Sequence, residues 1–143
     1  MAYSVYGDVE AEFKGMVLDT TSPVTDTEVT GFIAQADAEI NGLVGLRYVV
    51  PITGTDSLII MKMISIWLVA DRVAKILQVK TKTEENSTAG KSLREMALEL
   101  LDKIVKGEFL LADATRLSSA NGFKSYANDA QLEYTFKKGD TQW

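Results

Sequence analysis

The chain of 143 residues lacks both cysteine and histidine. Without cysteine it forms no disulfide bond and offers no thiolate as a nucleophile or metal ligand. Without histidine it lacks the commonest general base near neutral pH and the commonest ligand of transition metals. Motifs for calcium loops, phosphate-binding loops and nucleophile elbows are also missing, and the acidic residues are scattered. We therefore expect that the protein is not an enzyme and uses no cofactor and no metal ion.

Positive charge and long apolar runs are scarce as well. The sequence has 15 Lys and Arg against 20 Asp and Glu, whereas proteins that grip nucleic acid usually present a basic face. The best candidate for a membrane span, residues 58–79, carries charges that are costly inside a bilayer: Lys62, Asp71, Arg72 and Lys75. The N-terminus has neither the basic segment nor the apolar core of a signal peptide. We expect no membrane contact and no specific binding of DNA.

The sequence does contain clear helical periodicity. Thr25 and Glu28 have the spacing of a capping box, and Gly45 is placed to end the helix that they begin. Between them, apolar residues recur at spacings of three and four: Val29, Phe32, Ile33, Ala36, Ile40, Leu43 and Val44. Asp37 falls outside this stripe, so we expect it to face solvent.

Three more helices follow from the same reasoning. A stripe over residues 93–107 predicts an amphipathic helix, and an apolar run predicts a long helix over 57–79, capped by Thr55 or Asp56. A short helix is expected from Ser4 to about Phe13, and residues 80–90 are predicted to be a charged loop. The fold class is therefore predicted to be all-α, a small helical bundle with two long central helices.

The helix over residues 57–79 is apolar around most of its circumference. Such a helix contacts neighbours on several sides, and a domain of this size has few helices to surround it. We expect another subunit to cover part of its surface. Trp67, with Met61 and Met63, either packs within or between subunits or lines a pocket for a small molecule; packing is the simpler interpretation.

The helical pattern stops near residue 112, so residues 1–112 are predicted as a helical domain and 113–143 as an extended C-terminal arm. Leu132, Tyr134 and Phe136 alternate with polar residues, which is a strand pattern without a partner of its own. Either the arm is a frayed terminus or it adds a β-strand to a partner, which we favour. Its candidate contact residues are Phe123, Tyr126, Leu132, Tyr134, Phe136 and Trp143.

The most informative stretch is residues 36–51, Ala-Asp-Ala-Glu-Ile-Asn-Gly-Leu-Val-Gly-Leu-Arg-Tyr-Val-Val-Pro, a helix end followed by an Arg-Tyr-x-x-Pro turn. Arg47 sits just past a helix C-terminus, which favours a cation, and it could equally reach a carboxylate on an adjacent subunit. This stretch resembles the Mu-like group of phage head–tail connector proteins. The likeness extends over roughly residues 3–112, although Val49-Val50 stands where Pro-Leu is usual.

The resemblance implies a ring of about twelve copies beneath the portal of a tailed-phage capsid. Such an adaptor binds the portal on one side and a stopper or tail-completion protein on the other, and DNA passes through its channel without specific binding. It would be made in the host cytoplasm and reside in the neck of the virion. Interface residues would then include Arg47, Tyr48, Pro51 and Trp67. The alternative function is a small helical ligand-binding or regulatory module.

Overall fold

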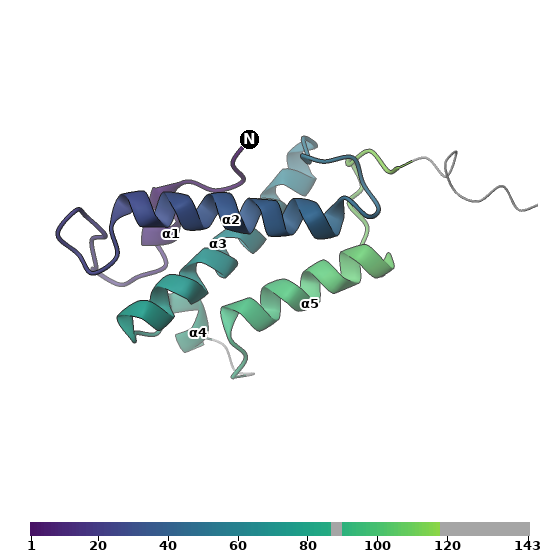
Figure 1. Cartoon of the computed structure of the whole chain (residues 1–143). Helices are drawn as coiled ribbons and strands as arrows, with labels where there is room; N and C mark the ends of the chain where they lie inside the picture. The colour runs from purple at the N-terminus through teal and green to yellow at the C-terminus, as the bar shows by residue number, and fades with distance from the viewer. Residues whose placement is uncertain (87–89, 118–143) are drawn as a thin grey trace, which may run out of the picture.

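The computed structural model describes residues 1–86 and 90–117, and over these residues the protein is an all-α bundle (Figure 1). Its helices are α1 (Tyr6–Glu10), α2 (Asp26–Val44), α3 (Thr55–Leu77), α4 (Lys82–Asn86) and α5 (Leu93–Lys106). The predicted fold class is confirmed. No helix within the described residues has the length and apolar character needed to cross a membrane.

Helix α3 is the centre of the bundle. It contacts α1, α2 and α5, and it crosses behind α2 in the view of Figure 1. Met61, Ile64 and Leu68 are among its buried side chains, and α2 and α5 also pack against each other. The central position expected for the most apolar helix is therefore what the bundle shows.

Capping boxes begin two of the long helices. At α2 the Thr25 hydroxyl accepts a hydrogen bond from the Glu28 N–H at 3.3 Å, and the Glu28 carboxylate accepts one from the Thr25 N–H at 2.9 Å. Ser92 and Glu95 repeat this pair at α5, with distances of 3.3 Å and 3.0 Å. The first box was predicted, and the second has the same Ser/Thr-x-x-Glu signature in the sequence.

Three expectations about local structure were wrong. Helix α1 ends at Glu10 rather than near Phe13, because the Glu10 carboxylate accepts a hydrogen bond from the Leu18 N–H at 3.0 Å and holds the returning chain. The loop predicted over residues 80–90 contains the short helix α4. Asp37, expected to face solvent, is only 6% exposed, because buried hydrogen-bond donors surround its carboxylate.

The start of α3 is capped from far along the sequence, not by Thr55 or Asp56. The Asp113 carboxylate accepts hydrogen bonds from the Asp56 N–H at 2.7 Å and the Ser57 N–H at 3.0 Å, and from the Ser57 hydroxyl. An anion at a helix N-terminus also meets the positive end of the helix dipole. These hydrogen bonds, the one from the Ser57 side chain foremost, hold the pKa of Asp113 below its usual value.

The described part of the predicted arm belongs to the helical domain. Besides the Asp113 cap, the Val49 N–H donates to the Thr115 carbonyl at 2.8 Å, and the Leu117 N–H donates to the Arg47 carbonyl at 2.9 Å. Residues that follow the predicted boundary at 112 are thus hydrogen-bonded to the bundle. The rest of the arm, residues 118–143, lies outside the described residues.

The Asp113 cap depends on a close approach to Gly54. A Cβ at Gly54 would lie 2.6 Å from the Asp113 carbonyl oxygen and 2.5 Å from its carboxylate carbon. We expect Gly54→Ala to displace the cap and lower the free energy of unfolding by about 1 kcal/mol or more, measured by urea denaturation. Gly31→Ala is the control, because nothing lies within 4 Å of a Cβ at that helical position. It should stabilise by about 0.5–1 kcal/mol. Equal effects of the two substitutions would contradict the close approach.

Candidate functional site

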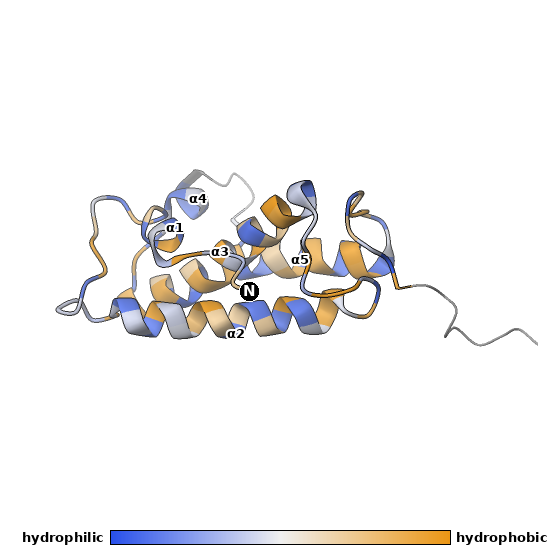
Figure 2. Cartoon of the chain, turned by 90° about the horizontal axis from the view of Figure 1, so that it is seen from above, coloured by the Kyte–Doolittle hydropathy of each residue, from blue (hydrophilic) through white to orange (hydrophobic). Residues whose placement is uncertain are grey.

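Exposed apolar side chains gather at the end of the molecule where α2 and α5 finish. We call this group the end surface; its members are between 37% and 69% exposed: Leu46, Val49, Phe109, Leu110 and Leu117. Figure 2 shows the apolar colouring in the loops at this end. Exposed apolar side chains that form a contiguous patch are typical of protein–protein contact sites.

Hydrogen bonds fix the three segments that carry the end surface. Tyr48 and Arg116 form an isolated antiparallel β-bridge, which joins the turn after α2 to the residues that follow Asp113. The Tyr48 hydroxyl accepts a hydrogen bond from the Leu111 N–H at 3.2 Å, which joins the same turn to the segment after α5. The fold therefore holds the segments of the end surface in fixed positions.

Arg47 is held inside the subunit. Its guanidinium donates to the Val105 carbonyl at 3.4 Å and lies so close to Gly107 that a Cβ there would come within 2.5 Å of it. This places the cation at the C-terminus of α5, where the helix carbonyls favour positive charge. The sequence predicted a helix C-terminus for Arg47, but the helix it meets is α5 rather than α2.

The other predicted interface residues lie in different places. Tyr48 is 0% exposed and packs in the core, so it is an internal residue of the subunit. Pro51 is exposed beside the end surface, after a cis Val50–Pro51 bond. Trp67 is half-buried against the core from α3. The remaining candidates lie outside the described residues: Phe123, Tyr126, Leu132, Tyr134, Phe136 and Trp143.

Some apolar side chains of α3 are not covered by the neighbouring helices. Ile59 and Met63, one helical turn apart, are 64% and 36% exposed. They form a second, smaller exposed apolar area. Sequence periodicity did not show which apolar side chains of α3 stay exposed, because apolar residues occur all round the helix between Leu58 and Ala70.

A buried polar network fixes the N-terminal segment to the bundle. Asp37 accepts hydrogen bonds from the Tyr3 N–H at 3.1 Å and from the Ser65 hydroxyl at 2.9 Å. The Tyr3 hydroxyl donates to the Asn41 side-chain oxygen at 2.6 Å and accepts from the Ile52 N–H at 3.0 Å. Burial raises the pKa of the Tyr3 phenol.

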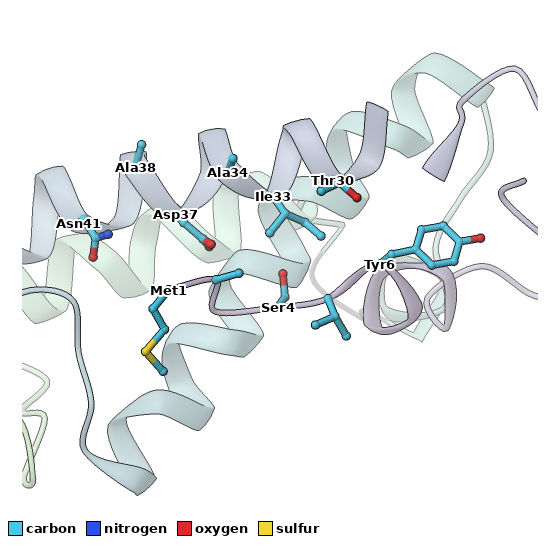
Figure 3. Close-up of a pocket in the computed structure, with 11 residues that line it drawn as sticks. Met1, Ser4, Tyr6, Thr30, Ile33, Ala34, Asp37, Ala38 and Asn41 are labelled. Carbon is cyan, nitrogen blue, oxygen red and sulfur yellow. The ribbon is translucent and has the colours of Figure 1, made fainter. Parts of the chain in front are cut away.

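Between this N-terminal segment and α2 lies a hollow of about 600 Å³. Its wall is mainly apolar, with Met1 and Val5 on one side and Ala34 and Ala38 on the other, and Asp37 lines it as well (Figure 3). Among the described residues no group of three or more acidic side chains is arranged to hold a metal ion. A mainly apolar wall of this kind suits an organic group or a side chain.

Comparison of the chain with models of protein families, with curated proteins and with solved structures finds no match. Its fold and surface define this chain as a small all-α protein with three features: an exposed apolar end, a second apolar area on α3 and a hollow beside a buried carboxylate. The argument for its function starts from these three features.

Proposed function

We propose that the protein is a structural head–tail connector of a tailed bacteriophage. It forms a ring beneath the portal, joins the capsid to a stopper or tail-completion protein, and continues the channel through which DNA passes. In this function the chain acts through its surfaces and performs no reaction. The ring has about twelve copies and cyclic symmetry, as in other closed homo-oligomers. The protein resides in the neck of the virion.

The end surface is the observation that carries this proposal. It is built around the Arg-Tyr-x-x-Pro turn, which is the part of the sequence that resembles the connector family. Arg47 and Tyr48 hold that turn against α5 and Leu111, so the turn presents Leu46 and Val49 outward in a fixed position. A rigid, exposed apolar end supports a role in assembly, because its burial against a partner gains free energy with little ordering cost.

Charge supports the same function. The chain carries a net charge of −5, which repels the phosphate backbone and suits a protein that lines a path for DNA without retaining it. The exposed pair Ile59 and Met63 on α3 gives each copy a second apolar area, distinct from the end surface. A closed ring requires two different contact areas on each subunit.

The test is a stop codon in place of Lys14 in the phage genome that encodes the chain. We expect heads that fill with DNA but carry no tails, and no infectious particles. Wild-type protein supplied in trans should restore infectivity, because the missing part is structural. Infectious tailed particles assembled without the chain, or a gene that lies outside any phage or prophage genome, would overturn the proposal.

A matched pair of variants links this test to the end surface. Leu117→Asp alters an exposed side chain of that surface, so the protein should fold but fail to restore infectivity. Glu84→Ala changes a polar residue in α4, far along the chain from the end surface, and should restore it fully. Equal rescue by both variants would show that the end surface takes no part in assembly.

The alternative function, a small helical ligand-binding or regulatory module, is favoured by the hollow beside Asp37. A volume of about 600 Å³ with a mainly apolar wall falls in the range of small-molecule sites. A ligand that raised the melting temperature of the purified protein, together with normal phage assembly in its absence, would favour this function over the connector.

A further inference from the structure

Asp37 differs from the other buried aspartate of the long helices in having no ion-pair partner within 4 Å among the described residues. Asp71 is equally buried, and it is paired with Lys75 at 2.6 Å. The hydrogen-bond donors on Asp37 are neutral, the Tyr3 N–H and the Ser65 hydroxyl. These donors offset part of the cost of removing a carboxylate from water, and no ion pair within the described residues adds to them. A cation that approached through the hollow would supply what is missing.

The wall of the hollow indicates what should accompany that cation. Ala34 and Ala38 are small and exposed on α2, and they line the hollow together with Met1 and Val5 of the N-terminal segment. Small residues on one side and apolar side chains on the other leave room for a bulky apolar group. The matching chemistry is therefore an aromatic or aliphatic group with a positive charge a few ångströms away.

Seven basic side chains of the described part of the chain form ion pairs with carboxylates other than Asp37. The sequence beyond residue 117, in contrast, contains Tyr134-Thr135-Phe136-Lys137-Lys138. In an extended chain alternate side chains point to the same side, so Phe136 and Lys138 would face one wall together while Lys137 would face away.

We propose that the hollow beside Asp37 binds residues 134–138 of a second copy of the chain, with Phe136 against the apolar wall and Lys138 paired with Asp37. This inference rests on the proposed function. The arm leaves one copy next to the end surface, and the hollow lies between the N-terminal segment and α2 of the other copy. A contact between two different surfaces is heterologous, which is the kind of contact that closes a ring.

The absence of cysteine allows a direct test by disulfide trapping. One full-length chain carries Ala34→Cys, in the exposed wall of the hollow, and a second, differently tagged chain carries Phe136→Cys. Because each has a single thiol, a mixed disulfide can form only between two copies. We expect the mixed dimer to exceed either homodimer on a non-reducing gel, in the purified mixture or in particles from the complementation assay.

Two matched controls locate the contact. Gln35→Cys is the neighbouring exposed position on α2 and lies outside the hollow, so it should give several-fold less mixed dimer than Ala34→Cys. Lys138→Gln, added to the Phe136→Cys chain, should lower the yield by about fivefold, whereas Lys137→Gln should leave it nearly unchanged. Circular dichroism of each variant verifies that it is folded.

Other outcomes would overturn the inference. If a chain with both Ala34→Cys and Phe136→Cys formed only the intramolecular disulfide, the arm would occupy the hollow of its own copy. Absence of the mixed dimer from both the purified mixture and the particles would show that the arm does not bind there. Either result, combined with tailless heads in the stop-codon test, would leave the connector function standing. Trapping of the mixed dimer in a protein that assembly does not require would instead overturn the connector function alone.

Discussion

Leu101→Asp is expected to leave the protein unfolded at 25 °C. Leu101 is 0% exposed and lies in the buried stripe of α5, which consists of Leu93, Ala97, Leu101 and Ile104. An aspartate there would place a carboxylate without a partner in an apolar core, at a cost of several kcal/mol. A domain of this size has a total stability of about 5–15 kcal/mol, so one such change removes much or all of it. Far-UV circular dichroism and thermal unfolding measure the loss directly.

The neighbouring residue provides the control. Leu100 belongs to the same apolar pattern in the sequence but is only half-buried in the structure. Leu100→Asp can turn its carboxylate toward water, so it should lower the melting temperature much less than Leu101→Asp. If the two variants melted alike, or if Leu100→Asp were the more damaging, the orientation of α5 in the bundle would be wrong.

The sequence predicted those features of the fold that depend on local patterns. The limits of α2 and α5 follow from Thr25 with Glu28 and from the glycines at positions 45 and 107, because capping involves residues only a few positions apart. The central place of α3 follows from the number of its apolar residues. Periodicity could not rank Leu100 against Leu101, because a stripe that is three to four residues wide includes both.

The features that the sequence did not predict depend on residues far apart in the chain. Asp113 caps a helix that begins at Thr55, and Tyr3 reaches the carboxylate of Asp37 and the N–H of Ile52. Neither contact leaves a local pattern. The same holds for the end surface, which combines residues that follow α2 with residues that follow α5. Arg47 and Tyr48 were noticed in the sequence as members of a motif, but the burial that explains them required the fold.

Tyr48→Ala should be the most damaging substitution in the Arg-Tyr-x-x-Pro turn. Tyr48 is fully buried, and the loss of a large aromatic side chain from a packed core costs about 3–5 kcal/mol. Its hydroxyl also accepts the hydrogen bond from the buried Leu111 N–H. The residue also lies in the backbone β-bridge to Arg116, so the loss of its packing should loosen the end surface as well as the core. Urea denaturation gives the loss of stability, and the complementation assay gives the loss of assembly.

Tyr48→Phe separates the two contributions. It keeps the ring and removes only the acceptor for the Leu111 N–H, which should cost about 1–3 kcal/mol because a buried donor is left without a partner. Since the packing of the turn is retained, this variant should still place Leu46 and Val49 correctly and support assembly. Tyr48→Ala should fail to do so even at temperatures where part of it is folded. A Tyr48→Ala protein as stable as wild type would mean that Tyr48 lies outside the core. If Tyr48→Ala lowered the free energy of unfolding by several kcal/mol and still supported assembly, the turn would not be what positions the end surface.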